Sequence, residues 1–204
     1  MGEGMFGTLH PLLGSALKGR KWEETPIQKI TIPILKSGKD GLIIAPTGSG
    51  KTMAAILPLL DRCLREEWQG LSILYITPLR ALNRDVDRRL TQLAEEVGLT
   101  VGIRHGDTTP YQRQKQVKKP PNILITTPET FQLMFTGIRL RELLTTVKVV
   151  IIDEVHDMAS GERGWQLSVG ISRLSAMKGS PCQMVGLSAT VGNPEQVALW
   201  LSPN

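Results

Sequence analysis

The chain has 204 residues and a formal net charge of +5 at pH 7, with 24 Lys and Arg against 19 Asp and Glu. Hydrophobic residues make up 41% of it and its mean hydropathy is −0.06, values typical of a soluble globular protein. No apolar run approaches the roughly 20 residues of a membrane helix, and no basic start followed by an apolar core marks a secretory signal. The sequence therefore predicts a cytoplasmic protein without a membrane segment, and its basic balance permits a polyanionic partner without requiring one.

The length fits one well-buried α/β domain covering residues 1–204. The two cysteines, Cys63 and Cys182, are far apart and belong to no CxxC or Cys/His cluster. A disulfide framework and a zinc site are therefore not indicated, and both residues are predicted to be core thiols.

Short β-rich runs alternate with longer helical patterns after Gly41. The predicted strands cover residues 42–45, 71–76, 100–103, 122–126, 147–152 and 183–187. One intervening helix is indicated by apolar residues at helical spacing, namely Leu82, Val86, Leu90, Leu93 and Val97. Several strands are apolar throughout, as strands covered on both faces should be. This alternation predicts βαβ units, and hence a parallel β-sheet flanked by helices on both faces.

The run APTGSGKT at residues 45–52 lies between the first predicted strand and a helical pattern. It fits the phosphate-loop pattern GxxxxGK[ST], except that Ala45 replaces the first glycine. Gly48 and Gly50 allow consecutive N–H groups to turn toward an anion, and a helix starting near Lys51 adds the positive end of its dipole. Lys51 is predicted to reach the β- and γ-phosphates, and Thr52 to ligate Mg²⁺. The predicted nucleotide-binding residues of this loop are Pro46, Thr47, Gly48, Ser49, Gly50, Lys51 and Thr52.

Two acids, Asp153 and Glu154, directly follow the apolar run 147–152. Ligands of parallel sheets bind beyond the carboxyl ends of the strands, so these acids are expected at the same edge as the phosphate loop. Two acids after a strand also commonly begin a helix, but the upstream loop favours a catalytic pair. Asp153 would then belong to the Mg²⁺ shell and Glu154 would polarise the attacking water. The predicted catalytic residues are Lys51, Asp153 and Glu154.

Five motifs occur in the order of superfamily 2 helicase motifs I, Ia, Ib, II and III: APTGSGKT, TPLRAL, TTPET, DEVH and SAT. The chain therefore resembles the N-terminal, RecA-like domain of an ATP-dependent superfamily 2 helicase. Upstream, the stretch TPIQ is similar to the Q motif, which implies that Thr25 and Gln28 bind the nucleotide and that Gln28 recognises the adenine edge. Glu24 stands where a proline often precedes that threonine.

DEVH and the segments 104–113, 162–174 and 186–201 are most similar to the large helicase-related (Lhr) group, with Ski-type RNA helicases as the nearest alternative. The resemblance implies ATP and Mg²⁺ as cofactors, and single- or double-stranded DNA or RNA as the polymer that is translocated or unwound. It also implies a second RecA-like domain as partner, which this chain lacks. Because the arginine fingers belong to that second domain, the chain by itself is expected to hydrolyse ATP feebly.

Motifs Ia and Ib place Thr-Pro or Pro near predicted helix starts, where backbone N–H groups and an arginine can bind phosphates without reading bases. Simple helix capping by Thr-Pro explains the same residues. By the resemblance, a further loop after the third strand also touches the nucleic-acid backbone. The predicted nucleic-acid-binding residues are Pro78, Arg80, Gly106, Thr127, Pro128 and Glu129.

By the resemblance, motif III couples the state of the γ-phosphate to the nucleic-acid surface and to domain closure. Ser188 and Thr190 are expected to hydrogen-bond toward the acids of motif II. His156 either joins that coupling or merely begins a helix, and Trp165 either stacks on a base or packs. Two other function classes fit part of the sequence. A phosphate-loop kinase or GTPase would need an acceptor lid or an NKxD motif, and no NKxD is present. A nucleotide-gated binding module without productive turnover is the alternative from a different class.

Overall fold

The computed structural model describes residues 4–78, 84–159 and 161–202, with residues 84–87 described by their backbone alone. Its strands are β1 (Gly41–Ile44), β2 (Ile73–Ile76), β3 (Val101–Arg104), β4 (Ile123–Thr126), β5 (Val149–Ile152) and β6 (Gln183–Ser188). They form one sheet in the order β1-β6-β5-β2-β4-β3, and every pairing is parallel. Each strand lies within about two residues of its predicted range, so the parallel sheet is confirmed.

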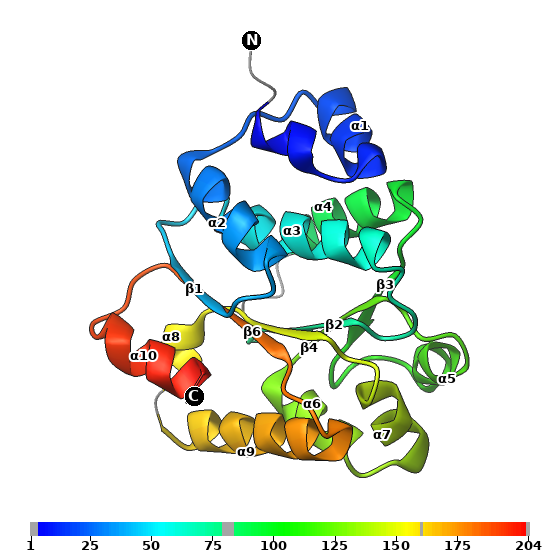
Figure 1. The fold of residues 1–204 in the computed structure, drawn as a ribbon. Helices are drawn as coiled ribbons and strands as arrows, with labels where there is room; N and C mark the ends of the chain where they lie inside the picture. Colours follow the sequence, from blue (N-terminus) through cyan, green and yellow to red (C-terminus); the bar gives the residue numbers. More distant parts are fainter. Residues whose placement is uncertain (1–3, 79–83, 160, 203–204) are drawn as a thin grey trace.

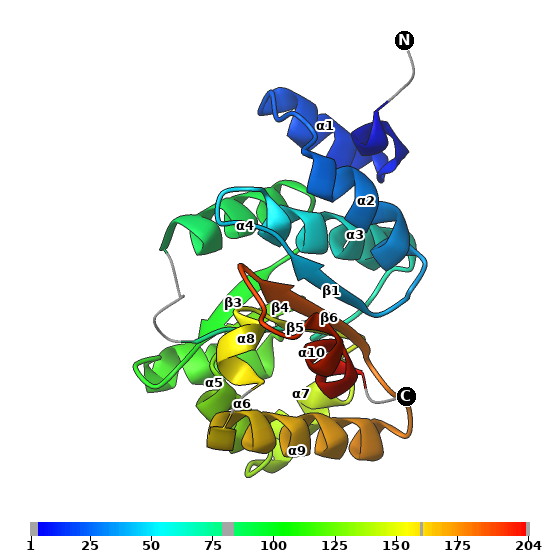
Figure 2. The same cartoon turned by 90° about the vertical axis from the view of Figure 1, so that its left-hand side faces the viewer.

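Helices cover both faces of this sheet (Figures 1 and 2). On one face lie η1 (Met5–Thr8), α1 (Pro11–Gly19), α2 (Pro26–Lys36), α3 (Lys51–Arg65) and α4 (Arg84–Glu96). The other elements are α5 (Pro110–Lys118), α6 (Pro128–Met134), α7 (Ile138–Leu144), α8 (Val155–Met158), α9 (Gly161–Lys178) and α10 (Pro194–Leu201), of which α6 to α10 pack on the opposite face. None of the helices in the described ranges is long and apolar enough to cross a membrane.

The two faces of the sheet have separate apolar cores because side chains alternate along each strand. On β2, Ile73 and Tyr75 join the core beneath α1 to α4, whereas Leu74 and Ile76 join the core beneath α6 to α10. Strand β5 alternates in the same way. Of the predicted periodic residues, Leu90, Leu93 and Val97 are buried, while Leu82 and the side chain of Val86 lie outside the described part of the chain.

Both cysteines are buried and free, as predicted. Burial raises the pKa of the Cys63 thiol to about 11. This thiol therefore stays protonated at neutral pH and acts as a small apolar group in the core beneath α1 to α4.

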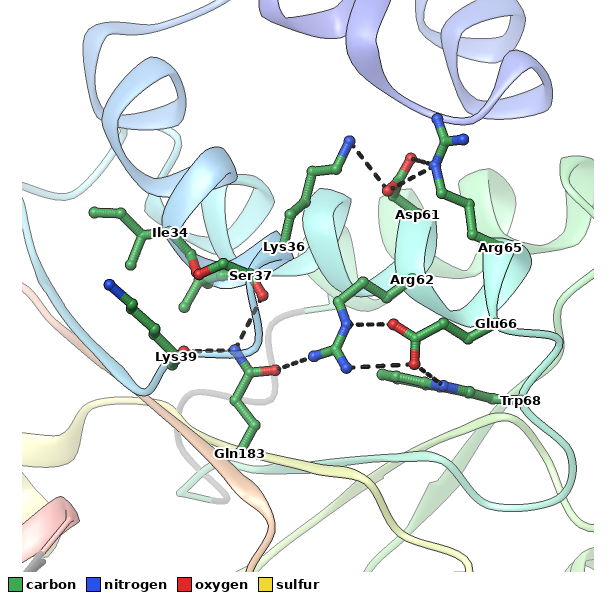
Figure 3. Close-up of polar contacts among 11 residues, drawn as sticks. Ile34, Lys36, Ser37, Lys39, Asp61, Arg62, Arg65, Glu66, Trp68 and Gln183 are labelled. Carbon is green, nitrogen blue, oxygen red and sulfur yellow. Dashed lines mark hydrogen bonds and ion pairs between the residues drawn. The ribbon is translucent and has the colours of Figure 1, made fainter.

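A fully buried carboxylate on α3, drawn with Lys36 and Arg65 in Figure 3, attaches the N-terminal segment to the helical layer. Asp61 of α3 lies 3.2 Å from Lys36 Nζ and 3.0 Å from Arg65 Nε. It also accepts a hydrogen bond of 2.5 Å from the backbone N–H of His10, and Lys36 Nζ donates to the carbonyl of Thr8 at 2.9 Å. Because two cations and a backbone amide contact this carboxylate, their interactions offset the desolvation cost of burying its charge.

Gln183, at the start of β6, joins the sheet to the ends of α2 and α3 (Figure 3). Its Nε2 donates to the carbonyls of Leu35 at 3.1 Å and Lys39 at 2.6 Å, and its Oε1 accepts from Arg62 at 2.7 Å. Arg62 also donates to Glu66, and this bond holds the pKa of Glu66 below its ordinary value. These contacts fix the helices at the amino ends of the strands, opposite the edge where ligands of such sheets bind.

Replacing Asp61 with alanine is expected to lower the free energy of unfolding by about 1–3 kcal/mol, because the N–H of His10 loses its acceptor and two cations lose their partner. Urea unfolding measures this loss, and hydrogen exchange should show faster exchange of the His10 amide. Asp107→Ala is the matched control, since that carboxylate side chain is 90% exposed. Equal stability of the two variants would contradict the anchoring role of Asp61.

Candidate nucleotide and nucleic-acid site

The loop at residues 45–50 connects β1 to α3 at the carboxyl edge of the sheet. Gly48 and Gly50 have φ values of +83° and +89°, in the left-handed region that favours glycine. The Ser49 N–H donates to the Pro46 carbonyl at 3.2 Å, which closes the turn. A Cβ on Gly50 would also lie only 2.9 Å from Nε2 of Gln28. The predicted phosphate-loop geometry is therefore formed by the local sequence.

Lys51 is the first residue of α3 and its side chain is 8% exposed. It has no ion pair or side-chain hydrogen bond with any residue in the described ranges. Lys51 is therefore free to contact an anionic ligand, which the N-terminus of α3 also favours. The hydroxyl of Ser49 is likewise buried, with no partner among the described residues. Thr52 follows on the first turn of the same helix.

Thr25 and Gln28 lie beside the phosphate loop, at the start of α2. Gln28 is buried, its Oε1 accepts from the Thr25 N–H at 3.1 Å, and its Nε2 reaches the Gly50 carbonyl at 3.5 Å. The two motifs are thus in contact, as a shared nucleotide site requires. The bond from Gln28 to the loop backbone was not expected from the sequence, and recognition of adenine by Gln28 stays a prediction.

Asp153 directly follows β5, and three hydrogen bonds hold it. Its N–H donates to the Ile76 carbonyl at 2.8 Å, which extends the ladder to β2. Its Oδ1 accepts from the Glu154 N–H at 2.9 Å, and its Oδ2 accepts from the Tyr75 hydroxyl at 2.6 Å. Sequence reasoning missed Tyr75. Tyr75 lies on the same face of β2 as Ile73. That position indicates a contact with Asp153 only when β2 and β5 are known to be neighbouring strands.

Glu154 has φ +49° and ψ +47°, a left-handed conformation that costs a residue with a side chain about 1–3 kcal/mol. Such strain persists where the surroundings impose it, and it is common among residues of active sites. Glu154 Oε2 lies 3.5 Å from His156 Nδ1. The backbone at Glu154 therefore turns sharply between the end of β5 and the start of α8.

His156 contacts motif III directly. Its Nδ1 lies 2.8 Å from Ser188 Oγ, and Ser188 Oγ donates to the Thr190 carbonyl at 2.9 Å. Because the single hydroxyl proton of Ser188 goes to that carbonyl, Ser188 accepts from the Nδ1–H of His156. Ser188 thus bonds to His156 of motif II, and Thr190 contributes its backbone carbonyl. A bond from Ser188 or Thr190 to Asp153 or Glu154 stays a prediction.

Thr127 and Pro128 begin α6, and both are buried. The Thr127 hydroxyl accepts from the Thr130 N–H at 3.3 Å, so the capping interpretation is confirmed for this hydroxyl. Glu129 forms an ion pair with Arg163 of α9 at 3.2 Å. A carboxylate repels phosphate, so Glu129 is better suited to holding Arg163 than to direct contact with a nucleic-acid backbone. Phosphate binding at this helix stays a prediction.

Gly106 lies in a loop that Arg113 braces. The Arg113 guanidinium donates to the carbonyls of Thr108, His105 and Gly106 at 2.9, 3.1 and 2.9 Å. A Cβ on Gly106 would meet no atom within 4 Å. The loop after β3 is therefore both fixed in shape and open at Gly106.

Of the two residues predicted to bind nucleic acid in motif Ia, the structure describes only one. Pro78 is half-buried just after β2, while Arg80 lies outside the described residues. Trp165 is 77% exposed on α9, so packing in a core is the wrong interpretation for this side chain. No group of three or more His, Cys, Asp or Glu side chains suited to a metal ion occurs among the described residues, so a Mg²⁺ site would have to include Thr52, phosphate oxygens or water.

Comparison with protein families gives a match to the DEAD/DEAH box helicase model over residues 25–197. Among curated proteins, the chain is 47% identical over 193 residues to the Lhr helicase/probable uracil glycosylase of Mycolicibacterium smegmatis. It is 38% identical over 213 residues to the ATP-dependent helicase Lhr-Core of Saccharolobus solfataricus. These alignments cover 87% and 98% of the chain but only 13% and 24% of the two relatives.

Among solved structures, the Mycobacterium smegmatis helicase Lhr bound to ssDNA and AMP-PNP aligns with a TM-score of 0.85 and 42% identity, covering 98% of this chain and 27% of that one. The DUF1998 helicase MrfA bound to DNA and AMPPNP aligns with a TM-score of 0.86 and 27% identity, covering 99% and 29%. These similarities confirm the RecA-like fold and the resemblance to the Lhr group; the Ski-type alternative is not favoured.

Proposed function

The chain belongs to the DEAD/DEAH box helicase family, and from this premise we propose that its ATP-binding domain drives translocation along nucleic acid, or its unwinding, by ATP hydrolysis. The observation that carries the proposal is the meeting of two motifs at one edge of the sheet. The left-handed glycine loop with buried, unpaired Lys51 follows β1, and the acids Asp153 and Glu154 follow β5. One motif suits a polyphosphate and the other suits a metal and a water molecule.

The chain's own residues divide the work in this proposal. Lys51 and the N–H groups of the loop bind the β- and γ-phosphates, and Thr25 and Gln28 bind the nucleoside end. Thr52 and Asp153 would hold Mg²⁺, which neutralises charge on the transferring phosphoryl group. The Glu154 carboxylate orients the attacking water and accepts its proton. His156, Ser188 and Thr190 connect Glu154 to the end of β6.

The proposal extends to partners beyond this chain, which spans 13% and 24% of the length of the two curated relatives. We assign residues 1–204 to one RecA-like domain that works against a second one. The relative's structure with ssDNA supports nucleic acid as the polymer, and DNA and RNA are both candidates. Because the second domain would supply the arginine fingers, this chain hydrolyses ATP feebly by itself. We propose that the protein works in the cytoplasm, where ATP and nucleic acid are both present.

Gly106→Asp tests the nucleic-acid surface. Gly106 has open space around it, so the new carboxylate fits without disturbing the loop. Its repulsion of the phosphate backbone is expected to weaken binding of a fluorescein-labelled single strand about fivefold, the equivalent of about 1 kcal/mol. Fluorescence anisotropy with DNA and RNA oligonucleotides measures the affinity.

Gly19→Asp is the matched control, because Gly19 also has nothing within 4 Å of an added Cβ and lies at the end of α1, on the outer helices. The control should bind the oligonucleotide as the parent chain does, and both variants should bind ATP normally. Equal oligonucleotide affinity of Gly106→Asp and the parent chain would remove the loop after β3 from the binding surface.

A further inference from the structure

Tyr75 donates a hydrogen bond to the motif II acid, and no motif predicted this contact. We propose that Tyr75 is a positioning residue for the metal site: its hydroxyl holds the Asp153 carboxylate in the orientation that binds Mg²⁺. This inference rests on the proposed function, because it takes Asp153 as a metal-binding residue. It concerns a residue of β2, outside the phosphate loop and outside motif II.

The sheet brings these two residues together. Strands β2 and β5 are parallel neighbours, and Tyr75 pairs with Ile151. Asp153 lies two residues beyond Ile151, about 6.6 Å along the strand direction, on the same face of the sheet. A tyrosine side chain spans this distance, and its hydroxyl lies 2.6 Å from Asp153 Oδ2. Tyr75 itself is buried in the core beneath α1 to α4, so its ring has little freedom to move away.

The hydrogen bonds on Asp153 leave it able to bind a cation. From the described residues, each carboxylate oxygen accepts one bond, Oδ2 from Tyr75 and Oδ1 from the Glu154 N–H. A carboxylate offers about four acceptor sites, so each oxygen keeps one for a metal ion or a metal-bound water. Two donors on two different oxygens also fix the rotation of the carboxylate plane. Partners that orient a metal-binding carboxylate in this way typically account for about 10–100-fold in metal affinity or activity.

Strand β2 therefore contacts Asp153 through two hydrogen bonds, one to its backbone and one to its side chain. The Ile76 carbonyl fixes its backbone N–H at 2.8 Å, and the Tyr75 hydroxyl fixes its side chain. The chain continues from the end of this strand to Pro78, where the predicted motif Ia contacts begin. The position of the acid at the metal site is thus tied to the strand that leads to the nucleic-acid surface.

Tyr75→Phe tests the inference, because it removes only the hydroxyl and keeps the ring in the core. Binding of a fluorescent ATP analogue is titrated with Mg²⁺ and with Mn²⁺, and measured again in excess EDTA. The metal concentration for half-maximal binding is expected to rise about 10–100-fold in the variant, while affinity in EDTA stays that of the parent chain. Tyr111→Phe is the matched control, since Tyr111 is 76% exposed and is the chain's other tyrosine.

Asp153→Asn distinguishes a failure of the inference about Tyr75 from a failure of the proposed metal role of Asp153. If Asp153→Asn loses the metal dependence and Tyr75→Phe retains it with a native unfolding transition, the inference about Tyr75 is overturned and the proposed function stands. If Asp153→Asn itself binds the metal and nucleotide as the parent chain does, both the metal role of Asp153 and the inference built on it fail. A raised metal requirement in Tyr75→Phe, with none in Tyr111→Phe, supports the inference.

Discussion

Glu154→Gln is expected to lower ATP turnover by about 10²–10⁴-fold, the range for loss of a general base, and to leave nucleotide affinity unchanged. Glutamine keeps the shape of the side chain and its contact with His156, but it cannot accept the proton of the attacking water. The measurement is single-turnover hydrolysis of radiolabelled ATP with Mg²⁺, in the presence of a second RecA-like domain and a single-stranded oligonucleotide. Fluorescent-nucleotide binding measures affinity separately.

Glu162→Gln is the control for the loss of a glutamate carboxylate, because Glu162 is exposed on the first turn of α9. It should hydrolyse ATP as the parent chain does. Turnover by Glu154→Gln at the rate of that control would remove Glu154 from its role as base. The unusual backbone conformation of Glu154 would then need another explanation.

Lys51→Ala is expected to weaken ATP binding on the order of 100-fold, because a charge-assisted contact to phosphate contributes up to about 3 kcal/mol. The unbound variant should be about as stable as the parent chain, since Lys51 forms no ion pair or side-chain hydrogen bond with another described residue. Thermal unfolding with and without ATP measures both effects. ATP raises the melting temperature of the parent chain and not that of the variant.

Lys39→Ala is the matched control, because Lys39 is exposed and its one contact to Gln183 uses the backbone carbonyl. The Lys51 and Glu154 variants together test the division of roles between binding and hydrolysis. An equal loss of nucleotide binding in both would contradict that division.

Sequence alone predicted the strands and the phosphate loop because both depend on local chemistry. The apolar runs ending at Ile76 and Ile152 are buried on both faces, and such runs identify central strands of a parallel sheet. The turn at Gly48 and Gly50 is likewise specified by the residues that form it. The rule that ligands of parallel sheets bind beyond the carboxyl ends of the strands then placed the acids at that edge, without knowledge of the order of the strands.

The contacts that escaped prediction join residues far apart in the chain. Tyr75 and Asp153 meet only because β2 lies next to β5, and His156 meets Ser188 only because β6 lies on the other side of β5. The strand order β1-β6-β5-β2-β4-β3 could not be read from local periodicity. For the same reason the contact of Ser188 with His156 and the use of the Thr190 backbone carbonyl were not predicted.

ATP turnover with Mg²⁺, by this chain alone and with an added second RecA-like domain, tests the central claim most directly. Each mixture is measured with and without single-stranded DNA or RNA. We predict feeble turnover by the chain alone and strong turnover only when domain and polymer are both present, with the more effective polymer identifying the substrate. Vigorous turnover by the chain alone would contradict the account of a split motor, and tight ATP binding without any stimulation would favour a nucleotide-gated binding module instead.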